Sequence, residues 1–412
     1  MPATHRIVLP AYLRSPAVRR IFTCLARNGQ QARFVGGCVR DSILHRPIYD
    51  IDIATTTTPK QTMQWLRDDR ILTIPSGIRH GTVTALLSGI TFEITTLRED
   101  IETFGRHARV TFTTDWHLDA RRRDFTMNAL YADQDGTVYD FFDGIRDARQ
   151  RRVRFIGVPH ERINEDYLRI LRFFRFLASH GSLPADEEAL AACRQLADQL
   201  AHVSAERLWK EIALLLKVAN PTAILALMAR CRVLAHLPEL AVRVEPIRRL
   251  CRLDTDYGGN VALRRFTAML KPETHADTVA ERWRFSGKQK KKLHTLLAAT
   301  TLAKKPWRTL VYRYGHSMLR DILLLSARPY GFMRCLYALR IGNVLNHARR
   351  FKAPRFPIRG KDLVALGYPQ DSKLGARLAQ TEAWWLKKNL TPNKQQCLDY
   401  VANNTPQKDT KP

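Results

Sequence analysis

Three groups of residues in the first half of the chain have types and spacings suited to chemistry on phosphates. The first begins with the segment Gly36–Asp41 (GGCVRD) and continues with Asp50 and Asp52. The preceding residues Ala32–Val35 predict a short strand that enters the two glycines. Glycines at this point let backbone N–H groups approach a triphosphate, and the positive end of the following helix points there. The segment therefore predicts a phosphate-binding loop.

The two aspartates predict a metal site. Asp50 and Asp52 are two residues apart on an expected strand, Tyr49–Ala54, so both carboxylates point to one face. Two carboxylates on a rigid strand suit the Mg²⁺ ions of two-metal phosphoryl or nucleotidyl transfer. An Asp-x-Asp sequence alone is more often a solvated turn, but behind a Gly-Gly-x-x-Arg-Asp loop it indicates catalysis. Glu93, on a later strand, is either a third carboxylate ligand or an exposed strand glutamate.

The second group is Arg121–Ala129 (RRRDFTMNA). Its cluster of arginines, which includes Arg123, offers positive charge for phosphates. Asp124 and Asn128 offer groups that can bind a ribose hydroxyl. A charged helix start with a capping residue would explain the same pattern.

The third group is Glu165–Phe176 (EDYLRILRFFRF). Asp166, Arg169, Arg172 and Arg175 recur every three residues and would form a stripe on one helix face. An ordinary surface ion pair in this stripe would contribute only ~0.3–0.5 kcal/mol. Three arginines against one acid leave excess positive charge, which favours an anionic ligand.

The elements around these groups change in character near residue 160. Before that point, the alternating segments 81–87 and 91–97 around Ser88-Gly89 predict a hairpin. Asp135-Gly136 predicts a second turn between two strands. After it, residues 161–178 and 185–232 have helical spacing, and the chain to about residue 400 stays helical and rich in Arg and Lys.

Composition restricts the partners and the compartment. The 412 residues contain 67 Lys and Arg against 39 Asp and Glu, a net charge of +28, which indicates a nucleic acid before an anionic membrane surface. No segment approaches the ~18 apolar residues of a membrane span, so we expect a soluble protein without a membrane partner. Seven scattered cysteines with no C-x-x-C favour a reducing compartment, the cytoplasm. The first forty residues lack acids; a basic first helix of the folded domain is favoured over a transit peptide.

Taken in order along the chain, these motifs resemble those of class II CCA-adding tRNA nucleotidyltransferases and bacterial poly(A) polymerases. The matching sequences are GGCVRD, DID, RRDFTMNA and EDYLRILRFFRF, joined by Gly81-Thr82-Val83, EITTLR from Glu93, DFFDG from Asp140 and Ser204-Ala205-Glu206-Arg207. The resemblance covers about residues 30–245. One departure is Asp143, where the family usually has glycine.

The resemblance implies a fold class and a division into domains. We expect an α/β nucleotidyltransferase head, a small mixed sheet with helices, followed by an all-α neck, body and tail. The head would span residues 1–155 with its core from about 30, and the neck residues 156–245. A tRNA-binding body and tail would span residues 246–402, before a disordered end at residues 403–412.

The resemblance also implies roles. Asp50 and Asp52 would hold Mg²⁺, while Gly36, Gly37 and Arg40 would contact the nucleotide phosphates. Arg123, Asp124 and Asn128 would meet the sugar-phosphate part, and Arg172 and Arg175 would neutralise the triphosphate or brace the base-reading pair. Asp166 and Arg169 would be that pair.

A carboxylate and a guanidinium can select both C and A. Asp166 would accept the amino group of cytosine or adenine, and Arg169 would donate to the ring nitrogen. Uracil and guanine carry a ring N–H where an acceptor is required, a buried mismatch that costs ~1–3 kcal/mol. One pair could therefore accept CTP and ATP and reject UTP and GTP.

Three activities fit this pattern: addition of CCA to tRNA, poly(A) synthesis or partial CCA addition, and RNA binding without catalysis. Overall similarity favours CCA addition to the tRNA acceptor arm. The segment 100–112, with Gly105, is a candidate for a flexible loop that changes the site from addition of C to addition of A. Retention of both Asp50 and Asp52 argues against a catalytically inactive RNA-binding protein. The chain has no His-Asp dipeptide, so no fused HD phosphohydrolase domain is expected.

Overall fold

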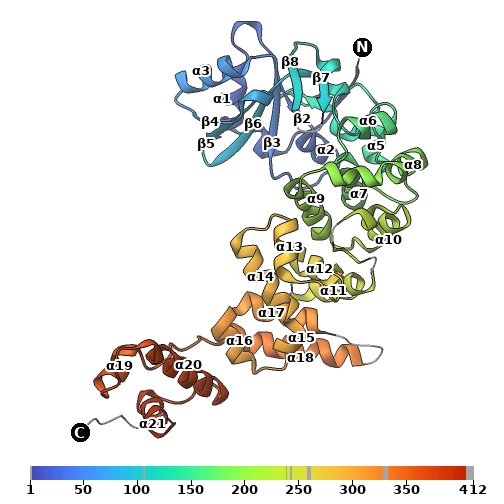
Figure 1. The fold of residues 1–412 in the computed structure, drawn as a ribbon. Coiled ribbons are helices and arrows are strands. Elements are labelled where there is room, and N and C mark those ends of the chain that lie inside the picture. Colours follow the sequence, from blue (N-terminus) through green and yellow to red (C-terminus); the bar gives the residue numbers. More distant parts are fainter. Residues whose placement is uncertain are drawn as a thin grey trace. The chain divides into compact units, whose positions relative to one another are not determined.

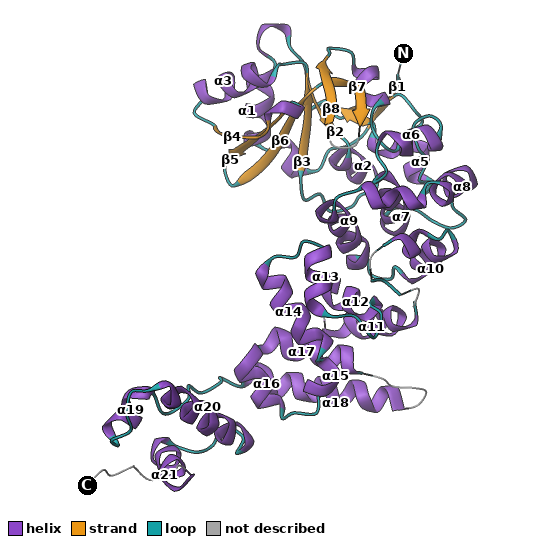
Figure 2. Ribbon diagram, viewed as in Figure 1, coloured by secondary structure: helices purple, strands orange, loops and turns teal. Residues whose placement is uncertain are grey.

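A computed structural model describes residues 2–104, 107–237, 239–241, 244–257, 261–327 and 333–404 (Figures 1 and 2). The chain divides into two compact units between residues 244 and 245, with Arg282–Arg284 counted in the first unit. The expected fold class, a mixed-sheet head followed by helices, is confirmed.

The head is built on one mixed sheet. Its strands run in the order β1-β10-β9-β2-β3-β6-β5-β4, and only β3 and β6 pair in parallel. Their bounds are β1 Ala3–Arg6, β2 Ala32–Val35, β3 Ile51–Thr55, β4 Leu72–Gly77, β5 Thr82–Leu87, β6 Ile90–Thr96, β9 Leu130–Ala132 and β10 Thr137–Asp140. The expected hairpin turns at Ser88-Gly89 and Asp135-Gly136 are both confirmed. A separate hairpin, β7 Arg98–Phe104 with β8 His107–Phe112, occupies the candidate loop, but Gly105 lies outside the described residues.

Helices cover the two faces of this sheet unequally. The head helices are α1 Pro16–Leu25, α2 Gly37–Ile43, α3 Pro59–Asp68, α4 Trp116–Arg121 and α5 Gly144–Arg149. On one face, Ile53 of β3 and Phe92 of β6 pack in a core with Ile21 of α1 and Leu66 of α3. On the other face, a smaller cluster joins β9, β2 and β3 to α4. The core on the face of α1 and α3 includes Leu9 and Leu13. The core of the head therefore begins earlier than the expected residue 30, because the basic first segment folds as the amphipathic helix α1.

The rest of the first unit is helical. Its helices are α6 Pro159–Glu165, α7 Arg169–Ser179, α8 Glu187–Gln195, α9 Ala205–Lys217 and α10 Thr222–Arg230. Helix α7 packs against both α9 and α10. Phe125 of the head packs with tilted rings against Phe173 and Phe176 of α7, which fixes α7 beside the sheet.

The second unit is entirely helical in its described part. Its helices are α11 Glu245–Tyr257, α12 Val261–Met269, α13 Ala276–Arg282, α14 Gly287–Leu297, α15 Ala299–Leu302, α16 Trp307–Tyr314, α17 His316–Ser326, α18 Met333–Arg350, α19 Gly360–Ala365, α20 Ser372–Lys387 and α21 Lys394–Asn404. One core contains residues of α11 and of the four helices from α15 through α18. A second core contains residues of α19, α20 and α21. Residues 403 and 404 still belong to α21, so the expected disordered end does not begin at 403; residues 405–412 lie outside the described part.

Buried ion pairs hold the first helices of this unit together. Asp254 of α11 pairs with Arg264 and Arg265 of α12, and Asp321 of α17 pairs with Arg264 and with Lys292 of α14. Since Arg264 and Asp321 are both fully buried, removing either partner would leave an uncompensated charge in the interior.

Candidate active site

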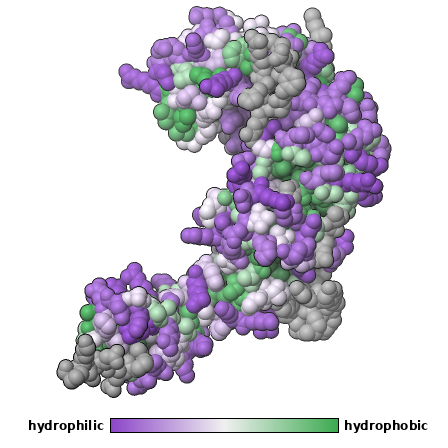
Figure 3. All heavy atoms as spheres, in the orientation of Figure 1, coloured by the Kyte–Doolittle hydropathy of each residue, from purple (hydrophilic) through white to green (hydrophobic). Residues whose placement is uncertain are grey.

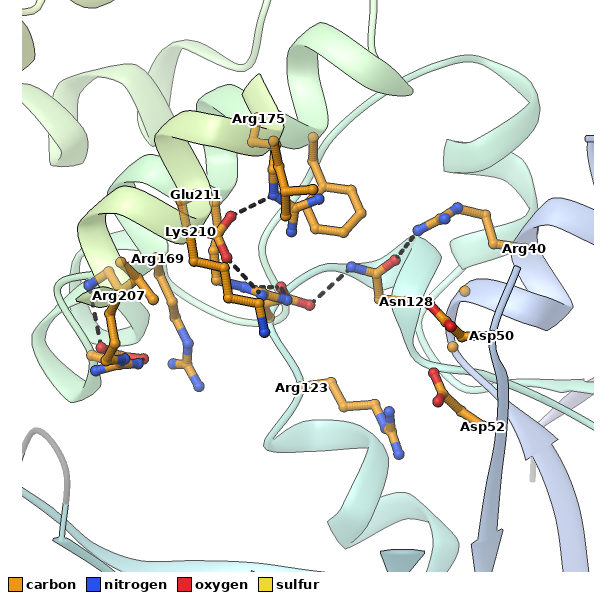
Figure 4. Close-up of a pocket in the computed structure, with 18 of the residues that line it drawn as sticks. Arg40, Asp50, Asp52, Arg123, Asn128, Arg169, Arg175, Arg207, Lys210 and Glu211 are labelled. Carbon is orange, nitrogen blue, oxygen red and sulfur yellow. Dashed lines mark hydrogen bonds and ion pairs between the residues drawn. The ribbon is translucent and has the colours of Figure 1, made fainter. Parts of the chain in front are cut away.

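Asp52 and Glu93 stand side by side on the parallel strands β3 and β6, in register with each other. Asp50 directly precedes β3, so the expected strand at 49–54 starts two residues later, at Ile51. All three carboxylates line one cavity of about 730 Å³ in the first unit. Figure 4 shows Asp50 and Asp52 on the same side of that cavity as Arg40, across from Arg169 and Arg207.

Burial, Glu93 and Asp50 together raise the pKa of Asp52 to about 6, although Arg123 opposes the shift. A group of oxygen ligands whose negative charges repel is the donor set that a hard divalent cation neutralises. No cluster of three or more potential ligands is preassembled among the described residues. Mg²⁺ commonly takes only one or two carboxylates and completes its shell with substrate phosphates and water. The residues present therefore fit such an ion.

The two glycines lie at the junction that the sequence predicted: Gly36 connects β2 to α2, and Gly37 is the first residue of α2. Gly36 has φ +71°, which a residue with a side chain rarely adopts. A Cβ atom there would lie 3.6 Å from the Asn128 carbonyl oxygen and 3.8 Å from Nη1 of Arg123. Glycine thus allows the loop to turn close to the cavity wall.

Asp124 is fully engaged with protein donors. One carboxylate oxygen accepts the N–H of Phe125 and Nδ2 of Asn128, and the other accepts Nε of Arg172 at 2.8 Å and its Nη2 at 2.5 Å. Burial favours the neutral acid, but Arg172 and the other donors outweigh it and hold the pKa of Asp124 well below its usual range. Since a carboxylate has about four acceptor positions, none remains for a ribose hydroxyl.

The contacts of Asp124 extend into a chain across the cavity wall. On one side Asn128 accepts Nη1 of Arg40 at 2.6 Å, while on the other Arg172 and Arg175 share the carboxylate of Glu211 on α9. Both arginines are therefore neutralised by protein acids, and this favours the bracing role over direct neutralisation of a triphosphate.

Arg123 is positioned by α4 and β9. Its guanidinium donates to Asp119 at 2.9 Å and to the Tyr131 hydroxyl at 3.0 Å. Arg123, Arg122 and the Tyr131 hydroxyl keep the pKa of Asp119 well below its usual range, against the effect of its burial. Arg123 thus points into the cavity as a fixed cation near Asp52 (Figure 4).

The expected single helix through residues 165–176 is wrong at its start. Helix α6 ends at Glu165, Asp166 has an extended conformation (φ −156°, ψ 104°), and α7 begins at Arg169. One oxygen of Asp166 accepts the N–H of Leu168 at 3.2 Å, a local bond that competes with helix continuation. Asp166 is therefore not on the helical stripe of the arginines.

Asp166 and Arg169 line the same cavity, but their side chains do not pair with each other. The carboxylate of Asp166 binds Nη2 of Arg207 on α9 at 2.6 Å. Arg169 donates to Glu165 and to the backbone carbonyls of Arg162 and Arg122. These three bonds leave two of the five guanidinium N–H groups of Arg169 available, since an arginine carries five donors.

The cavity is also lined by residues for which the sequence predicted no individual role. They include Arg98, Arg122, Arg207, Lys210, Glu211 and Leu214. Arg207 is the last residue of the Ser204-Ala205-Glu206-Arg207 motif, one of those that carry the family resemblance. Lys210 and Glu211 on α9 have a spacing that any charged helix can show, so the sequence does not single them out. Lys210 is exposed and has no ion pair among the described residues, and Figure 4 shows its side chain extending into the cavity.

This arrangement defines a class of enzyme. A mixed sheet with a Gly-Gly loop, adjacent carboxylates and an arginine-lined cavity is typical of nucleotidyltransferases. Residues 32–154 match the family described as "Poly A polymerase head domain", and residues 185–243 match "Probable RNA and SrmB- binding site of polymerase A". Nucleotidyltransferases generally use divalent metal ions.

Individual relatives identify the family more narrowly. The chain is 32% identical over 419 residues to "CCA tRNA nucleotidyltransferase 1, mitochondrial" of Danio rerio, covering 97% of this chain and 95% of the relative. It is 39% identical over 232 residues to the CCA-adding enzyme of Anoxybacillus flavithermus, covering 56% and 57%. The structure of the Bacillus stearothermophilus CCA-adding enzyme in complex with CTP matches with a TM-score of 0.75 at 26% identity, covering 94% and 98%. The chain belongs to the CCA tRNA nucleotidyltransferase family.

Proposed function

We propose that this chain adds the 3′-terminal CCA to tRNA from CTP and ATP by Mg²⁺-dependent nucleotidyl transfer, releasing pyrophosphate. The observation that carries the proposal is that one cavity brings together Asp50 and Asp52, the fixed cation Arg123 and the candidate base-reading residues Asp166 and Arg169. The names of its relatives and the CTP complex of a structural neighbour support CCA over poly(A) addition.

Asp50 and Asp52, with Glu93 as a third candidate, would hold Mg²⁺. The ion would supply charge neutralisation for the attacking and departing oxygens. Gly36, Gly37, Arg40 and Arg123 would bind the phosphates.

Lys210, whose charge no described acid neutralises, is a further candidate for the triphosphate. Asp124, Asn128, Arg172 and Arg175 would brace the wall of the site rather than contact the sugar, because their polar groups bind one another or Glu211.

Asp166 and Arg169 would read the base. The side chain of each is held by contacts outside the pair, and each retains hydrogen-bonding capacity: one further acceptor position on each Asp166 oxygen and two N–H groups on Arg169. Cytosine and adenine both match this acceptor and donor, whereas uracil and guanine do not.

The proposal also includes the cellular compartment in which the protein acts. No helix among the described residues is long and apolar enough to cross a bilayer. Six cysteines are buried free thiols, which suits a reducing compartment, and we propose the cytoplasm. Three similar relatives are named as mitochondrial proteins.

The test uses purified full-length chain and tRNA that lacks its 3′ CCA. CTP alone should extend the tRNA by two nucleotides, CTP with ATP by three, and extension should then stop. Asp52→Ala should abolish incorporation while tRNA binding persists. Runs of A on tRNA ending in CCA would instead indicate a poly(A) polymerase, and full activity of Asp52→Ala would refute the metal assignment.

A further inference from the structure

The face of the head sheet that carries Asp52 and Glu93 continues, uncovered, to the β4 edge. Cross-strand partners in a sheet share a face, so the pairs Thr84–Glu93 and Ile74–Thr84 place Ile74 of β4 on the carboxylate face. Leu72 and Leu86 pair with each other two residues further along, on the same face.

This surface is apolar and exposed. Leu72, Ile74 and Leu86 are 58%, 51% and 39% exposed, and together with Thr84 and Thr91 we call them the β4–β6 platform. The cluster that covers this face elsewhere joins β9, β2 and β3 to α4 and includes no residue of β4, β5 or β6. Figure 3 shows the hydrophobic surface of the head gathered over this part of the sheet.

The position of the platform relative to the nucleotide cavity restricts what can bind there. The cavity is lined by residues of α2, α7 and α9 and of the segment between α4 and β9, and none of its lining residues belongs to β4 or β5. A nucleotide bound by those helices approaches the carboxylates from the β2 side. In-line transfer requires the attacking hydroxyl on the opposite side of the reacting phosphorus, since the entering and leaving oxygens lie roughly in line. The platform lies on that side.

We propose that the β4–β6 platform seats the last nucleotides of the tRNA acceptor end and so positions the 3′-hydroxyl at Asp52 and Glu93. Strands lie ~4.8 Å apart, so β4 lies about 10 Å from β6, a span that one to three nucleotides cover. Aliphatic side chains offer the flat faces of unpaired bases an apolar contact, and the Thr84 and Thr91 hydroxyls can bond to ribose or base edges. Arg79, exposed between β4 and β5, adds charge for a phosphate. This inference rests on the proposed function.

The first experiment compares Ile74→Thr/Leu86→Thr with wild type. Threonine keeps the preference for strand structure and removes most of the apolar surface. We expect KM for tRNA lacking CCA to rise about fivefold, KM for CTP to stay within twofold, and the melting temperature to stay unchanged, because reduced apolar contact weakens only the acceptor end. The matched control is Val8→Thr, an 82% exposed head residue outside the platform, which should leave all three values unchanged.

The outcomes separate the inference from the proposed function. If wild type adds no nucleotide to such tRNA, the proposed function fails. If wild type is active and the double variant has unchanged KM for tRNA, the platform inference alone is refuted. A wild-type dimer that the double variant dissociates would also refute it, because a second copy would then occupy the platform.

A binding measurement gives an independent readout. An acceptor-stem minihelix with 4-thiouridine at its penultimate 3′ position should cross-link under long-wavelength light to a peptide within residues 71–91. Cross-links confined to the second unit would overturn the proposal.

Discussion

At the scale of single residues, two kinds of charge share the candidate site. Asp124 and Glu211 bind arginines and serve the structure, whereas Asp52 is partly buried without such a partner among the described residues and is repelled by Glu93 and Asp50. The first set stabilises the folded cavity wall. In the second set, the unfavourable charge on Asp52 would be neutralised by a bound cation, and this is why we propose that set for catalysis.

We expect Asp52→Asn to stabilise the protein without metal. Since the folded-state pKa of Asp52 is raised to about 6, the carboxyl favours folding when protonated, and this contribution is lost as pH rises from about 4 through 6. At pH 8 and in EDTA, the substitution should raise the unfolding free energy by up to about 3 kcal/mol. Calorimetry with and without Mg²⁺ measures the effect.

Mg²⁺ provides the matching comparison. It should raise the melting temperature of wild type and have a much smaller effect on Asp52→Asn. Destabilisation of the variant in EDTA would contradict an unfavourable charge on Asp52 from its burial and from Glu93 and Asp50.

Replacement of Asp166 by Ala should relax base selection. Loss of the acceptor for the amino group of C or A should lower the CTP/UTP preference by about 5- to 150-fold, the range that a 1–3 kcal/mol mismatch spans. Incorporation of each nucleotide by folded variant protein measures this ratio. Asp133→Ala breaks an ion pair with Arg33 outside the cavity and should leave the preference unchanged. The same preference in both variants would mean that Asp166 serves only to bind Arg207.

At the scale of elements, the sequence predicted the parts that depend on local rules. The Gly-Gly loop, the β5–β6 hairpin and the β9–β10 turn follow from turn chemistry and alternation, and the structure has all three. The break between α6 and α7 did not follow from periodicity, because a side-chain bond of Asp166 and its ion pair with Arg207 on a distant helix decide it. Lys210 and Glu211 were missed for the same reason: only tertiary packing of α9 against α7 brings them to the site.

The turn before α5 allows a test of the one departure from the family pattern. Asp143 has φ +59°, where glycine is less strained. Asp143→Gly should therefore raise the unfolding free energy, by about 0.5 kcal/mol once the greater freedom of glycine in the unfolded chain is subtracted. Chemical denaturation measures the change.

The next residue should behave in the opposite way. A Cβ atom at Gly144 would lie 2.2 Å from the carbonyl oxygen of Thr126, so Gly144→Ala should destabilise the head strongly. Destabilisation by Asp143→Gly would show that the aspartate side chain contributes more than its backbone strain costs.

At the scale of the whole molecule, positive charge is distributed unevenly. Residues 245–412 contain 33 Lys and Arg against 12 Asp and Glu, a net charge of +21, whereas residues 1–244 contain 34 against 27, a net charge of +7. The helical unit has no comparable acidic content to neutralise this excess. A polyanion should therefore bind chiefly through the second unit, while the first unit supplies the chemistry.

Binding of tRNA should accordingly weaken steeply with salt, and the second unit should determine the slope. Each phosphate contact contributes about −0.7 to −0.9 to the slope of log K against log salt concentration. Replacing the exposed Lys288, Lys291, Lys304 and Lys305 by Gln should reduce the slope by as much as about 3 and leave the KM for CTP unchanged. The matched control replaces four exposed cations of the head, Arg6, Arg14, Arg19 and Lys60, and should change the slope much less. Fluorescence titrations at several salt concentrations give both slopes; equal reductions would show that net charge alone, rather than its concentration in the helical unit, attracts the RNA.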